Sequence, residues 1–170
     1  MKNLFKIVVI CFLLTSIVFA CDVFNHPVKP TEIMEYVPQF KNTTCQFTQI
    51  KTIPNSPVVL KSGGDFFFNK ETGVVFYTKY PIKMTTIYDK NEQVNKIISC
   101  VIEKNFTMLE KNFSFYFKNN TNFWELGLIP NNPQIKHHLA KLYISGDSII
   151  RNIKIINNDG TITQIDFIEG

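Results

Sequence analysis

Cysteine is scarce in this chain of 170 residues, which contains only Cys11, Cys21, Cys45 and Cys100. Small exported domains that depend on disulfide bonds for their stability have a much higher cysteine density. The low count therefore excludes a disulfide scaffold. A hydrophobic core must hold the fold together, and 45% of the residues are hydrophobic.

A strong excess of one charge is also missing. The formal net charge of the whole chain is +4, from 18 basic and 14 acidic residues. The basic residues are scattered, and no run of them could follow a phosphate backbone. The charge pattern therefore gives no support for nucleic acid as a partner, and we expect none.

The residue patterns that carry catalysis or bind cofactors are absent from the sequence. Its three histidines are His26, His137 and His138, and no nucleophile-elbow motif accompanies a serine. No spaced set of histidines and cysteines suits zinc, and no glycine-rich loop suits a phosphate group. We expect a protein that is not an enzyme and that has no cofactor and no metal site.

The chain has no apolar run of the length that crosses a membrane as a helix. The uncharged stretch from Ile7 to Cys21 is shorter than the roughly 20 residues required. Lys2 and Lys6 precede it and small Ala20 ends it, which is the order of a secretory signal peptide. The sequence predicts that residues 1–20 are removed on export and that residues 21–170 form one domain.

Export leaves three cysteines, an odd number. Cys21 would be the first residue of the exported chain, so two interpretations stay open for it: a lipid attachment site, or an ordinary N-terminal cysteine. For Cys45 and Cys100 we predict a disulfide bond in an oxidising compartment.

Most of the chain has the alternating pattern of β-strands. Segments rich in β-branched and aromatic residues begin at Cys45 and are separated by Gly, Pro, Asn and Asp. Three short helices are expected, at 31–36 with Thr31 as the N-cap, after Glu92, and after an Asn132 cap. Short connections favour antiparallel neighbours, so the fold class is mostly β, with a meander topology.

Two consecutive strands carry large apolar side chains on both of their faces. Phe66 and Phe68 point one way and Phe67 the other, and Phe76 alternates in the same manner with Tyr77. One explanation is a two-layer sandwich with loops over its outer face. The other is a strongly curved sheet whose concave side holds an apolar cavity beneath short helices.

An ordered set of motifs resembles the LolA-type periplasmic lipoprotein carriers. The motifs are FTQIK at 47–51, LKSGGDFFF at 60–68 and GVVFYTKYP at 73–81, followed by the looser matches WELGLIP, LYISGDSIIRNIKI and DGTITQIDF. The resemblance covers roughly residues 31–168. It implies an incomplete antiparallel barrel with a helical lid over its concave face.

The resemblance also implies a role and a location. The protein would be a periplasmic carrier that holds the acyl chains of lipoproteins and moves them toward the outer membrane. Its partners would be this cargo, an inner-membrane transporter that releases it and an outer-membrane acceptor, and the carrier would be a monomer. Two alternatives remain open: a lipid or glycolipid shuttle, and an envelope-stress sensor of the same fold.

The same resemblance assigns residues to the cavity and to the lid. Inward aromatic residues would line the acyl cavity, and their outward neighbours would pack under loops and helices. The expected cavity residues are Phe47, Phe66, Phe68, Phe76, Phe113, Phe115 and Trp124, and the expected lid residues are Ile33, Met34, Val94, Ile97, Ile98 and Val101.

The sequence departs from the family at two positions. Val75 stands where other members carry an arginine that hydrogen-bonds to the lid, and Cys21 suggests a lipid that the soluble carriers lack.

Overall fold

The computed structural model describes residues 22–40, 43–69, 73–88 and 93–169. The expected signal peptide and Cys21 lie outside these residues. The described residues contain no helix that has both the length and the apolar character needed to cross a membrane.

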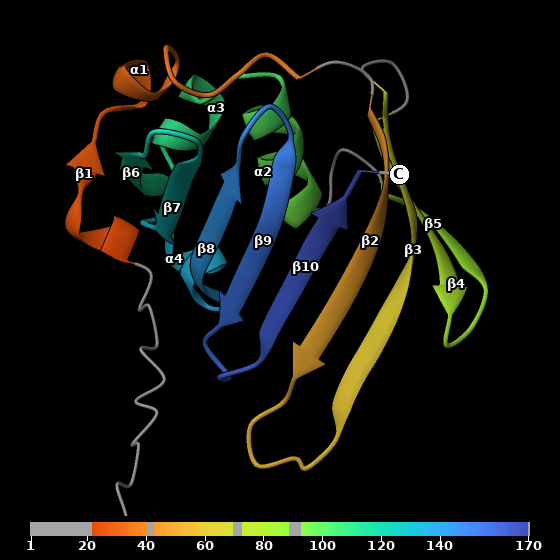
Figure 1. Cartoon of the computed structure of the whole chain (residues 1–170). Coiled ribbons are helices and arrows are strands. Elements are labelled where there is room, and N and C mark those ends of the chain that lie inside the picture. Colours follow the sequence, from red (N-terminus) through yellow and green to blue (C-terminus); the bar gives the residue numbers. More distant parts are fainter. Residues whose placement is uncertain (1–21, 41–42, 70–72, 89–92, 170) are drawn as a thin grey trace, which may run out of the picture.

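The described residues form one antiparallel sheet with short helices against it, so the mostly β fold class is confirmed (Figure 1). The strands are β1 (Pro27–Val28), β2 (Thr43–Thr52), β3 (Val59–Asn69), β4 (Gly73–Tyr80), β5 (Met84–Tyr88), β6 (Phe113–Asn119), β7 (Trp124–Pro130), β8 (Leu139–Gly146), β9 (Ile150–Asn157) and β10 (Ile162–Ile168). The helices are the 3-10 helix η1 (Asp22–Asn25), α1 (Pro30–Ile33), α2 (Gln93–Ile102), α3 (Thr107–Glu110) and α4 (Pro133–Lys136).

The sheet has the order β1-β6-β7-β8-β9-β10-β2-β3-β4-β5. Two runs of neighbouring hairpins, β2 to β5 and β6 to β10, account for most of the pairings, as the meander expectation requires. The pairing of β10 with β2 joins the two runs, and Phe167 lies opposite Phe47 there. The sheet does not close, because β1 and β5 stay at its edges.

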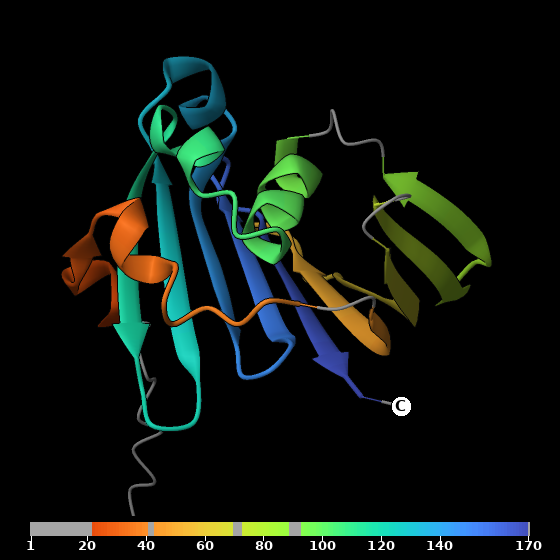
Figure 2. The same ribbon diagram turned by 90° about the horizontal axis from the view of Figure 1, so that it is seen from above.

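The sheet curves around its helices (Figure 2), and the described residues form no second sheet that could cover it. Of the two explanations for the double-sided strands, the curved sheet is therefore correct and the sandwich is wrong. The concave face and the helices share one core, to which the buried residues of β6 and β7 belong: Phe113, Phe115, Phe117, Trp124, Leu126 and Leu128.

The outer face is less covered than expected. Phe67 is 36% exposed and Tyr77 is 50% exposed, and their rings pack edge-to-face with centroids 6.1 Å apart. The expectation that outward aromatics pack under loops and helices is wrong at this place, because α2, the helix nearest to these strands, lies on the inner side of the sheet. Outside cover is present at the other end, where Phe24 of η1 lies so close over Gly127 that a Cβ there would approach the ring to 2.6 Å.

Local signals place several element ends. Asn132 caps α4 by accepting a hydrogen bond from the Gln134 backbone N–H at 2.9 Å. Gly160 turns the last hairpin with a φ of +81°, a conformation that suits glycine. The expected cap Thr31 is wrong by two residues, because Pro30 is the first helical residue and Lys29 is the N-cap.

Candidate functional site

Four phenylalanines from adjacent strands meet on the concave face. Phe47, Phe66, Phe76 and Phe167 come from β2, β3, β4 and β10, and all four are buried. The ring centroid of Phe76 lies 4.9 Å from that of Phe47 and 5.0 Å from that of Phe66. The centroids of Phe66 and Phe167 are 4.8 Å apart, and all three pairs are edge-to-face. We call these four residues the phenylalanine cluster.

A β-bulge between β3 and β4 shapes the sheet beside the cluster. The register shifts between Gly63 and Gly64, and Gly64 lies opposite Phe47. A Cβ at Gly64 would come within 1.8 Å of the Tyr77 carbonyl oxygen, so only glycine permits this close approach. The glycines of the SGGD segment therefore give β3 the bend that the curved sheet needs.

An open groove lies on one side of the phenylalanine cluster. Its volume is about 300 Å³, at the lower end of the range for ligand pockets. Strands β2 to β5 and the turn after β4 supply its walls, which consist of Phe47, Gln49, Ser62, Phe76, Thr78, Pro81, Ile82, Met84 and Thr86. The apolar side chains and the small polar ones together suit a ligand that has an apolar chain and a polar, solvated end.

A much smaller cavity lies on the other side of the cluster, under α2. It holds about 20 Å³, which is room for one water-sized sphere. It is lined by Phe40, Cys45, Phe66, Phe68, Ile98, Ile102, Ile149, Ile150, Ile153 and Phe167. An acyl chain can enter this space only if α2 or the rings beneath it move.

Helix α2 is the main cover over the concave face. Ile97, Ile98 and Val101 are all at most 2% exposed and belong to the core, as does Ile33 of α1. The expected lid residue Met34 is 43% exposed, because it follows the end of α1 and does not join the core. The side chain of Val94 lies outside the described residues.

The structure divides the expected cavity residues into three groups. Phe47 and Phe76 line the groove, and Phe66 and Phe68 line the cavity under α2. Phe113, Phe115 and Trp124 line neither of these two hollows. They are packed in the closed core. The ring centroids of Phe115 and Phe106 are 6.4 Å apart there, and those of Trp124 and Phe40 are 6.1 Å apart.

Cys45 and Cys100 are free, buried thiols, in contrast to the disulfide that we expected. Cys45 projects from β2 into the cavity under α2, and Cys100 belongs to α2 itself. Burial raises the pKa of Cys45 to about 11, against the opposing effect of nearby Arg151. Burial also raises the pKa of Cys100.

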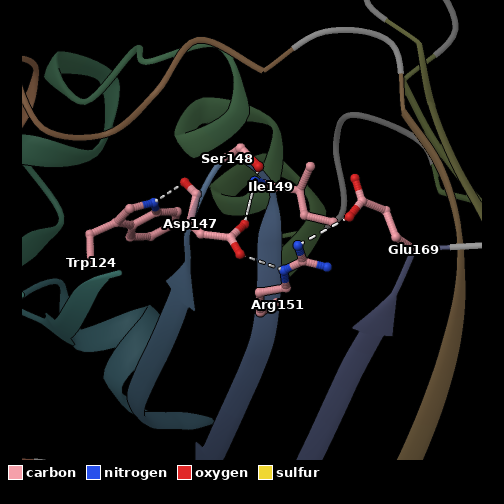
Figure 3. Close-up of polar contacts among 6 residues, drawn as sticks. All are labelled: Trp124, Asp147, Ser148, Ile149, Arg151 and Glu169. Atoms are coloured by element: carbon pink, nitrogen blue, oxygen red, sulfur yellow. Dashed lines mark hydrogen bonds and ion pairs between the residues drawn. The ribbon is translucent and has the colours of Figure 1, made fainter. Parts of the chain in front are cut away.

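A polar cluster lies at the β8–β9 turn (Figure 3). The Asp147 carboxylate accepts hydrogen bonds from the Ile149 backbone N–H at 3.0 Å and from Arg151 Nε at 2.9 Å. The Asp147 carbonyl accepts one from Trp124 Nε1 at 2.9 Å. Partial burial opposes the charge on Asp147, but the bonds from Ile149 and Arg151 outweigh it and lower its pKa.

Sequence reasoning missed the residues of the groove rim and the polar cluster. Ile82 and Met84 are not among the expected cavity residues, although Ile82 in the turn after β4 and Met84 at the start of β5 line the groove. Arg151 had one signal, since it is the sole arginine among 18 basic residues. Among the described residues, no three His, Cys, Asp or Glu side chains gather in a way that would hold a metal ion.

Comparisons with known proteins give a distant structural likeness. No family model matches the chain, and no curated protein matches its sequence. Among solved structures, the chain is similar to a LolA superfamily protein from Nitrosomonas europaea, with 8% identity over 84% of this chain and 92% of that one. The TM-score is 0.39, which is too low for this likeness to identify a function.

Proposed function

We propose that the protein is a carrier that binds acyl chains on its concave face, with the groove between β2 and β5 as the entry site. The groove itself is the observation that supports this proposal. It is an open hollow of about 300 Å³ that has buried aromatic rings as its floor and exposed apolar residues at its rim.

The energetics favour an acyl ligand. Each methylene that leaves water contributes about 0.8 kcal/mol, so ten methylenes in contact with Phe47, Phe76 and Met84 would contribute about 8 kcal/mol. Such binding needs apolar area and no reactive group. The groove also stays open at its rim, so a ligand can leave toward a competing membrane or protein.

The more specific proposal concerns the cargo and the route. The motifs at 47–51, 60–68 and 73–81 resemble those of lipoprotein carriers, so lipoproteins with their acyl chains are the proposed cargo. The carrier would act in the periplasm, between a releasing transporter at the inner membrane and an acceptor at the outer membrane. Native mass spectrometry of the protein isolated from its own envelope would identify the cargo by its mass.

Binding of a fluorescent fatty-acid probe to the full chain tests the proposal. Met84→Glu places a carboxylate on the groove wall, at a side chain that is 58% exposed and therefore tolerates the charge. Thr85→Glu is the matched control, because Thr85 is exposed and pairs with the outward Tyr77. We expect saturable binding by the wild type, an affinity at least tenfold lower for Met84→Glu, and no change for Thr85→Glu.

Two results would contradict the proposal. If the wild type shows no saturable binding of the probe, the protein does not bind acyl chains. If Met84→Glu and Thr85→Glu both bind the probe as the wild type does, the groove is not the binding site.

A further inference from the structure

Arg151, the sole arginine of the chain, lies at the start of β9 with its guanidinium between two carboxylates. Its Nε donates to Asp147 at 2.9 Å and its Nη2 donates to Glu169 at 3.2 Å (Figure 3). Among the described residues, no acceptor contacts the remaining nitrogen, Nη1. Arginine presents a planar fork of donors that matches a carboxylate or a phosphate, whereas lysine does not.

The two carboxylates are held in different ways. Asp147 also accepts hydrogen bonds from the Ile149 backbone and from Ser148, so it is built into the turn. Glu169 follows the end of β10, its side chain is 64% exposed, and its bond to Arg151 is the longer of the two. One side of the guanidinium is therefore fixed by the fold, and the other side holds a partner that an incoming anion can replace.

Arg151 does not itself line the apolar cavity under α2, but the two residues before it do. Ile149 and Ile150, on the N-terminal side of Arg151, line that cavity. Cys45 also lines it, and the charges of Arg151 and Glu169 both act on the Cys45 thiol. Cavity, phenylalanine cluster and groove then follow one another along the concave face, since Phe66 borders the cavity and contacts Phe76 of the groove.

We propose that Arg151 binds the anionic head group of an acyl ligand, and that Glu169 occupies this place when no ligand is bound. The ligand class is an acyl chain with a carboxylate or phosphate head, whose chain passes from Arg151 through the cavity under α2 toward the groove. This inference rests on the proposed binding of acyl chains and not on the lipoprotein cargo, because the ester- and amide-linked acyl chains of a lipoprotein carry no free carboxylate or phosphate.

A competition assay with the fluorescent fatty-acid probe and the full chain tests the inference. Palmitate and hexadecanol have the same chain length and differ in the charge of the head, and lysophosphatidic acid carries a phosphate instead. We expect palmitate or lysophosphatidic acid to displace the probe at least tenfold better than hexadecanol does. The better of the two anionic ligands identifies the source of the head group as a carboxylate or a phosphate.

Three variants assign the preference to Arg151. Arg151→Gln should abolish the preference for an anionic head. Lys154→Gln removes the same charge from the same strand. Lys154 follows buried Ile153 and therefore lies on the outer face, so this variant should keep the preference for an anionic head. Glu169→Gln should strengthen palmitate binding several-fold, since it weakens the group that competes for Arg151. If the role of Arg151 were purely structural, Glu169→Gln would not raise the affinity for palmitate.

The outcomes separate the inference from the proposed function. If palmitate, lysophosphatidic acid and hexadecanol compete equally, or if Glu169→Gln gives no gain, the inference is wrong and acyl binding remains. If none of them competes and the probe does not bind, both are wrong. A melting curve of each variant establishes that it is folded, and Glu169→Gln tests the inference even if Arg151→Gln does not fold.

Discussion

Replacement of Phe76 by alanine tests whether this residue is part of a binding groove or an ordinary core residue. Phe76 is buried and makes edge-to-face contacts with Phe47 and Phe66, with ring centroids 4.9 Å and 5.0 Å apart. Truncation of a phenylalanine in a closed core costs about 3–5 kcal/mol of unfolding free energy. One side of Phe76 faces the groove, so water can enter the space that the ring leaves, and we expect a cost near the lower limit, about 3 kcal/mol.

The assay is urea denaturation, followed by a melting curve and a titration with the fatty-acid probe. For a domain of this size, a loss of about 3 kcal/mol lowers the melting temperature by roughly 6–12 °C. The affinity for the probe should fall in the same variant, because the ring forms part of the groove floor.

Two matched variants give the comparison. Phe115→Ala removes an equally buried ring that meets Phe106 and lines neither hollow, so it should cost about 3–5 kcal/mol and leave the probe affinity of the folded protein unchanged. Tyr77→Ala, at the exposed neighbour of Phe76, should cost less than about 1 kcal/mol. The reasoning is refuted if Phe76→Ala loses less than about 1 kcal/mol and binds the probe normally.

Two further predictions concern titratable groups. At pH 8, an alkylating reagent should label Cys45 and Cys100 far more slowly in the native protein than in guanidinium chloride, because burial raises both thiol pKa values. Equal rates, or no labelling after unfolding without reductant, would contradict two buried free thiols. Asp147 has a lowered pKa in the folded protein, so its charge stabilises the fold above the unfolded pKa of about 3.9, and this contribution is lost as the pH falls through the folded value. Asp147→Asn should therefore be less stable than the wild type at pH 7, and a difference in melting temperature that stays constant down to pH 2 would refute the assignment.

The sequence was most informative where a structural signal is local. The expected inward residues Phe113 and Phe115 are buried on the same face of β6, and the expected Asn132 cap marks the start of α4. In each case the deciding interaction joins residues a few positions apart, or follows from the two-residue period of a strand.

Features that depend on distant contacts were not predictable in the same way. Alternation places Phe66 and Phe67 on opposite faces, but it does not say which face is concave or whether the other is covered. The pairing of β10 with β2 decides this, because it brings Phe167 beside Phe66 and extends the curved face. Arg151 joins Glu169 across the same sheet, so its setting could not be read from neighbouring residues.

Side chains separate the groove from the cavity under α2. The free energy that holds these side chains in place is similar in size to the free energy that an acyl chain gains when it is buried. A chain that extends from the groove to Arg151 must displace contacts between the phenylalanine cluster and the α2 residues Ile98 and Ile102, which line the cavity with it. Full burial of such a side chain contributes about 1.5–3 kcal/mol, which is the contribution of about two to four buried methylenes. An acyl chain of ordinary length therefore replaces the apolar contacts that it breaks. The closed core and the proposed acyl-bound state differ in which apolar groups fill the space, and the groove is the proposed entrance for the acyl chain.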